Sequence, residues 1–77
     1  MTATGEAARD VAVRGEVIRL GQFLKLADLA DSGSDAAALV AAGSVTVNGR
    51  PEARRGRQLT AGDVVGAPAG RARVVLA

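Results

Sequence analysis

The residues of this chain best suited to chemistry are four arginines placed close together. They fall within eight positions, as Arg50, Arg54, Arg55 and Arg57. A guanidinium group is planar, stays charged at any physiological pH, and can donate two parallel hydrogen bonds to phosphate oxygens. The spacing therefore predicts non-covalent binding of a polyanion, provided that neither Glu52 nor Asp63 pairs with these arginines.

Side chains that support catalysis are scarce. The 77 residues include no His, Cys or Tyr, so the serines lack an imidazole partner. Asp28, Asp31 and Asp35 suit helix ends better than a paired-carboxylate site. Asp31, Gly33 and Asp35 resemble the start of a calcium loop, but Ala42 occupies the twelfth position, where a bidentate Glu is required. We therefore expect no enzyme activity, no metal site and no cofactor.

Charge is distributed unevenly along the chain. Residues 39–77 carry six of the ten basic residues and two of the eight acidic ones, whereas residues 1–38 are net acidic. A local positive field attracts a polyanion even when the total charge is small. The N-terminus lacks a basic segment, and no apolar run approaches the roughly 20 residues of a membrane span. We expect a cytoplasmic monomer, with a disordered tail over residues 1–12 and a single domain over 13–77.

The arginines follow a predicted β-hairpin. Val45, Thr46 and Val47 favour a strand, and Asn48-Gly49 is the strongest short signal for a type I′ turn, which needs positive φ at both central positions. Further strands are expected near 13–19, near 59–65 and over 71–76. A rigid hairpin would hold the arginines in a fixed array.

Two helices should support the hairpin. Leu20, Phe23, Leu24 and Ala27 follow the helical period and predict a helix over about 21–28. A second helix should begin after Ser32 and run to about 42. Phe23 is the only aromatic residue and belongs to the apolar face, so we expect it in the core. Without exposed aromatic platforms, the chain should recognise the shape and phosphates of folded RNA rather than single strands.

Several segments together resemble the S-four RNA-binding domain, or alpha-L motif, and within it the stand-alone YbcJ-like subgroup. They are residues 20–26, 32–36, 39–49, 54–59 and 62–65. The resemblance covers about residues 16–76. It implies an α+β fold in which two helices pack on a small, twisted, mostly antiparallel sheet. It also implies that the first helix, the start of the second helix and the hairpin bind structured RNA, either ribosomal or tRNA-like.

The resemblance implies eight RNA-binding residues by position: Arg19, Gln22, Lys25, Ser34, Arg50, Arg54, Arg55 and Arg57. Gly33 stands where many members have Arg, and Ala37 where the subgroup usually has Lys. The second helix is thus nearly uncharged on its exposed side. We therefore expect the hairpin arginines to dominate the RNA surface.

Two other functions are compatible with parts of the pattern. The arginines could instead bind an acidic protein partner, as in a protein-interaction module. A ubiquitin-like sulfur carrier also has a Val-Asn-Gly hairpin, but its chemistry needs a C-terminal Gly-Gly. This chain ends at Val74–Ala77, which argues against a carrier.

Overall fold

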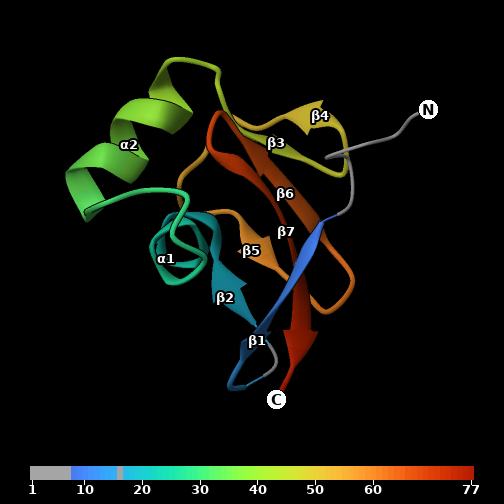
Figure 1. Cartoon of the computed structure of the whole chain (residues 1–77). Coiled ribbons are helices and arrows are strands. Elements are labelled where there is room, and N and C mark those ends of the chain that lie inside the picture. Colours follow the sequence, from blue (N-terminus) through green and yellow to red (C-terminus); the bar gives the residue numbers. More distant parts are fainter. Residues whose placement is uncertain (1–7, 16) are drawn as a thin grey trace.

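Two short helices lie to one side of a small twisted sheet (Figure 1). The computed structural model describes residues 8–15 and 17–77. The helices are α1 (Leu20–Leu26) and α2 (Gly33–Ala41). The strands are β1 (Arg9–Val13), β2 (Ile18–Arg19), β3 (Thr46–Val47), β4 (Arg50–Pro51), β5 (Gln58–Leu59), β6 (Val64–Ala67) and β7 (Gly70–Leu76).

The strands form two sheets. The larger sheet has the order β1-β7-β6-β3-β4, and the smaller one pairs β2 with β5. Every pairing is antiparallel except that of β1 with β7. The predicted α+β fold, with two helices and a mostly antiparallel sheet, is therefore confirmed.

The N-terminal segment differs from the prediction. Arg9–Val13 pairs in parallel with β7, from Arg9 beside Ala72 to Val13 beside Leu76, so the predicted disorder over 1–12 is wrong for residues 9–12. Residues 1–7 lie outside the described part of the chain. β1 forms because β7 offers free backbone groups along its edge, and because its last residue, Val13, is buried in the core. The single strand expected near 13–19 is instead two strands.

The core lies between the helices and the larger sheet. Phe23, Leu20 and Leu24 have no exposed surface, which confirms the predicted inner face of α1. The start of α2 also follows its sequence, because the Ser32 hydroxyl accepts a hydrogen bond from the Asp35 amide at 3.0 Å. The two helices therefore present their N-terminal turns at fixed positions beside the loop that follows β4.

Candidate nucleic-acid interface

Residues 52–57, here called the arginine loop, connect β4 to β5. Glu52 begins the loop and is only 8% exposed. Its Oε1 accepts a hydrogen bond from Arg57 Nη1 at 2.9 Å, and its Oε2 accepts from Arg54 N at 3.0 Å and Arg54 Nε at 3.2 Å. The bond from Arg57, followed by that from the Arg54 amide, lowers the pKa of Glu52 from 4.5 to about 2. The loop is thus folded around an ionised carboxylate.

The arginine loop also docks on the start of α1. The first amides of a helix have no partner within it, and here two of them donate to the loop. Leu20 N donates to the Arg57 carbonyl at 2.8 Å, and Gly21 N donates to the Arg55 carbonyl at 2.9 Å. A Cβ at Gly21 would lie 2.6 Å from Arg55 Cγ, so the missing side chain lets the Arg55 stem cross the helix.

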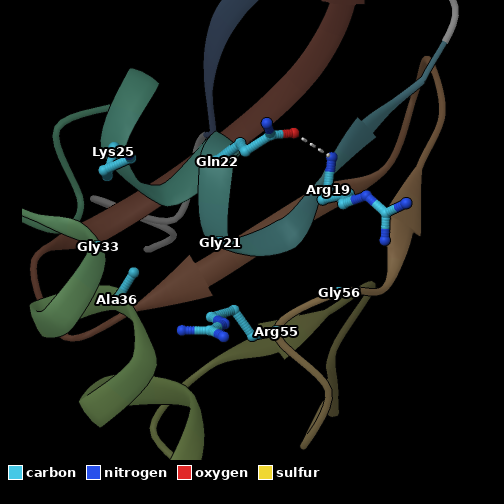
Figure 2. Close-up of a pocket in the computed structure, with 8 residues that line it drawn as sticks. All are labelled: Arg19, Gly21, Gln22, Lys25, Gly33, Ala36, Arg55 and Gly56. Carbon is cyan, nitrogen blue, oxygen red and sulfur yellow. Dashed lines mark hydrogen bonds between the residues drawn. The ribbon is translucent and has the colours of Figure 1, made fainter.

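Docking of the loop creates a basic recess between α1, the start of α2 and the loop (Figure 2). Its volume is about 360 Å³, and it is lined by Arg19, Gly21, Gln22, Lys25, Gly33, Ala36, Arg55 and Gly56. Figure 2 shows the Arg55 guanidinium between the two helices, whereas the Arg19 side chain extends on the other side, toward Gly56. Arg19 Nη1 lies 3.5 Å from the place that a Cβ at Gly56 would occupy. None of the described residues lining the recess is acidic, so its polar side chains are three cations and one amide.

The structure brings together four of the eight residues expected to bind RNA. Arg19, Gln22, Lys25 and Arg55 all line the basic recess. Ser34 lies next to it, exposed in the first turn of α2. The recess therefore joins the first helix, the start of the second and the arginine loop.

The other three arginines are placed differently. Arg50 is exposed in the edge strand β4 and does not line the recess. Arg54 and Arg57 form ion pairs with Glu52, with side chains 77% and 35% exposed. Only Arg50 lies in a strand of the hairpin, so the expectation of one rigid hairpin carrying all four arginines is wrong. The chain leaves the larger sheet after β4 because β5 pairs with β2 instead.

Of two further residues important to the site, Gly21 was not predicted from the sequence, whereas Glu52 was named as a possible partner of the arginines and does pair with two of them. Gly21 has no signal of its own, because its role depends on a loop far along the chain. Glu52 does carry a signal, since it is the only acidic residue among four nearby arginines. The second acidic candidate, Asp63, accepts hydrogen bonds from the Asn48 side chain and the Thr60 amide, both at 3.0 Å.

Two other kinds of site were sought in the described part of the chain. There, no group of His, Cys, Asp and Glu side chains is placed to hold a metal ion. Neither of the helices described has the length and apolar character that crossing a bilayer requires.

The sequence of this chain matches the model of a known protein family. A family model described as S4 domain matches residues 11–75. The chain belongs to the S4 domain family. This confirms the resemblance seen in the sequence, and the match extends across most of the region described here.

One sequence relative and one solved structure of similar fold can be compared with this S4 domain. The chain is 48% identical over 58 residues to "Probable ribosome maturation protein RlbA" of Bacillus subtilis (strain 168), a match that covers 75% of this chain and 82% of the relative. The crystal structure of the 30S ribosomal protein S4e from Thermoplasma acidophilum superposes with a TM-score of 0.59 at 22% identity. That match covers 77% of this chain but only 31% of the ribosomal protein, so the likeness concerns the fold of one part of it.

Proposed function

We propose that this S4-domain protein is a non-catalytic RNA-binding module that acts on structured RNA, of ribosomal or tRNA-like type, during ribosome maturation. The basic recess and the exposed arginines around it form the binding surface. One observation carries the proposal: Arg19 and Lys25, from the continuous β2–α1 segment, and Arg55, from the distant arginine loop, all line one hollow in which no described lining residue is acidic. Such convergence costs electrostatic repulsion, which an anionic ligand would relieve.

The rest of the surface supports contact with a phosphate backbone. Arg50 and Arg54 are exposed, and Ser34 lies beside the recess with a hydroxyl that can donate to a phosphate oxygen. The only aromatic residue, Phe23, is fully buried, which favours binding through shape and phosphate over the stacking of successive bases. A role in ribosome maturation is supported by the name of the Bacillus relative.

The proposal is tested by removing two cations of the recess. The double variant Lys25→Gln with Arg55→Gln should weaken binding to a fluorescent, fully paired RNA hairpin by about tenfold or more, because each neutralised phosphate contact contributes through counterion release. Fluorescence anisotropy measures the affinity, and circular dichroism shows that the variant remains folded.

Arg73→Gln provides the matched control. It removes the same kind of charge, but Arg73 Nη1 pairs with Asp10 at 3.1 Å on the β1–β7 edge, away from the recess. Its affinity should stay within about twofold of the parent protein, because Arg73 does not line the recess, and the variant should stay folded, since an exposed pair contributes little to stability. The proposal fails if the parent protein does not bind RNA, or if the control loses as much affinity as the double variant.

A pull-down with and without nuclease separates RNA from an acidic protein partner. Under the proposal, captured ribosomal components are released when the RNA is digested. Capture of an acidic protein that survives digestion would instead support a protein-interaction module.

A further inference from the structure

We infer that the basic recess holds one unpaired nucleotide of the bound RNA, and that its base is guanine or uracil. This inference rests on the proposed RNA-binding function and extends it. The preferred substrate would be a folded RNA with a bulged or extruded residue, not a uniform duplex.

The shape of the recess is the first argument. Its volume of about 360 Å³ falls within the roughly 300–1,000 Å³ range of pockets that enclose small ligands. Three of its lining residues are small: Gly21, Gly33 and Ala36. The bases of an intact duplex are stacked inside the helix, and its phosphates can engage exposed cations without entering a hollow. A hollow of this size suits a group that has left the stack.

The placement of Arg55 is the second argument. Its stem crosses α1 at Gly21, and its carbonyl is held by the Gly21 amide at 2.9 Å. Unlike Arg54 and Arg57, it forms no ion pair within the described part of the chain. Its guanidinium points between α1 and α2 (Figure 2). A guanidinium plane stacks on a nucleobase, and with Phe23 buried, Arg55 is the planar cation positioned to do so.

The donors in the recess decide which base fits. Guanidinium and ammonium groups only donate hydrogen bonds. Gln22 can also accept, but its Oε1 is already engaged by the Arg19 amide at 3.2 Å. Most of the polar groups that line the recess are therefore donors. Guanine presents O6 and N7 side by side on one edge, and uracil presents two carbonyl oxygens, whereas adenine and cytosine each place an amino donor beside an acceptor.

The experiment uses four RNA hairpins that differ at one position. The first is fully paired, the second has a bulged uridine, the third has the same bulge without its base, and the fourth has a bulged adenosine. The parent protein should bind the uridine bulge at least about fivefold more tightly than the paired and abasic hairpins, the low end of what stacking one base contributes. It should also bind the uridine bulge more tightly than the adenosine bulge, because adenine can stack but places an amino donor beside the donors of the recess. The abasic bulge keeps the bend and the phosphates, so it isolates the contribution of the base.

Two variants test the recess itself. Gly33→Leu places a side chain where a Cβ meets nothing within 4 Å, so it should fill the recess without straining the helix. Arg55→Lys keeps the charge and removes the plane. In both, the preference for the uridine bulge over the paired hairpin should fall below about twofold. Ala38→Leu places the same side chain at an exposed position of α2 outside the recess and should keep the preference.

The outcomes separate this inference from the proposed function. Equal affinity for all four hairpins overturns the inference while RNA binding stands. An abasic bulge bound as tightly as uridine also overturns it, because the protein would then read only the bend. Tighter binding of adenosine overturns the assignment of the base. Failure to bind any hairpin removes the proposed function itself.

Discussion

At the scale of single residues, Glu52 controls two of the neighbouring arginines. Its carboxylate accepts three hydrogen bonds from Arg54 and Arg57 while almost buried. A buried carboxylate is stable only when such donors surround it. The conformation of the arginine loop and the burial of the Glu52 carboxylate therefore depend on each other. The two arginines serve as structural partners of Glu52 as well as surface cations.

The lowered pKa of Glu52 predicts how stability depends on pH. The folded state holds the proton less tightly than the unfolded state, because the pKa falls from 4.5 to about 2 on folding. Its contribution is therefore fully present above about pH 4.5 and disappears as the pH falls toward 2. Urea unfolding of the parent protein and of Glu52→Gln should show a difference in unfolding free energy that shrinks across this range.

Asp10→Asn is the control for this titration. Asp10 pairs with Arg73 but is 59% exposed, so its removal should change stability little at any pH. A gap between parent and Glu52→Gln that stays constant from pH 6 to pH 2 would contradict the assigned role of the carboxylate.

Gly21 is a second residue with a specific prediction. Gly21→Ala should destabilise the protein by about 1–3 kcal/mol despite the higher helix propensity of alanine, because the new methyl group collides with the Arg55 stem. RNA affinity should fall as well, since Arg55 must move. Urea unfolding and anisotropy measure the two effects.

Gly33→Ala is the matched substitution in α2. A Cβ there meets nothing within 4 Å, so stability should be unchanged or rise by less than about 1 kcal/mol. Equal effects at the two glycines would mean that Arg55 does not rest on α1.

At the scale of elements, the hairpin is short but tightly anchored. Asn48 and Gly49 have φ of 52° and 85°, as the predicted type I′ turn requires. The Asn48 side chain also reaches the next strand, donating to Asp63 Oδ1 at 3.0 Å and accepting from the Val64 amide at 2.9 Å. Strands of only two residues, β3 and β4, are thus held by a side chain as well as by their own pairing.

Substitutions at Asn48 separate these two contributions. Asn48→Ala should cost about 1–3 kcal/mol, because it loses both side-chain bonds and places alanine at positive φ. Asn48→Gly loses the same bonds but adopts positive φ freely, so it should cost less. Thermal or urea unfolding measures the two losses of stability. A larger loss for Asn48→Gly than for Asn48→Ala would contradict the assigned role of positive φ.

At the scale of the whole molecule, the positive charge available to bind an anion is smaller than the number of arginines suggests. Glu52 offsets part of the charge of Arg54 and Arg57, whereas no acidic side chain among the described residues lines the basic recess. Under the proposed function, the positive charge available to RNA is therefore concentrated at the recess between the helices. The hairpin contributes Arg50 at its edge.

The salt dependence of RNA binding should reflect this arrangement. Three phosphate contacts by Arg19, Lys25 and Arg55 predict a slope of about −2 to −3 for log K against log salt concentration, at roughly −0.7 to −0.9 per contact. Glu52→Gln should steepen the slope, because it releases two more arginines. Affinities measured across a salt series test this prediction, and a parent slope near −4, at roughly −0.7 to −0.9 for each of five contacts, would mean that Arg54 and Arg57 leave Glu52 on binding.

Features that depend on a few adjacent residues could be predicted from the sequence. The Asn48-Gly49 turn, the Ser32 cap and the burial of Phe23 each follow from local backbone preference or helical period. The α+β fold follows from the order of such elements. Four of the eight expected RNA-binding residues do meet at one recess, because α1 places Gln22 and Lys25 on its exposed side.

The remaining features arise only when distant segments meet. Residues 9 and 10 look polar and irregular alone, and they extend the strand of residues 11–13 because the β7 edge offers hydrogen bonds to them. Whether an arginine faces a ligand or a carboxylate depends on the path of its loop. That path is set by the pairing of β5 with β2 and by the docking of the loop itself on α1. Local sequence specifies backbone conformation, but partners separated along the chain specify where a charge points, since contacts between distant segments exist only in the packed fold.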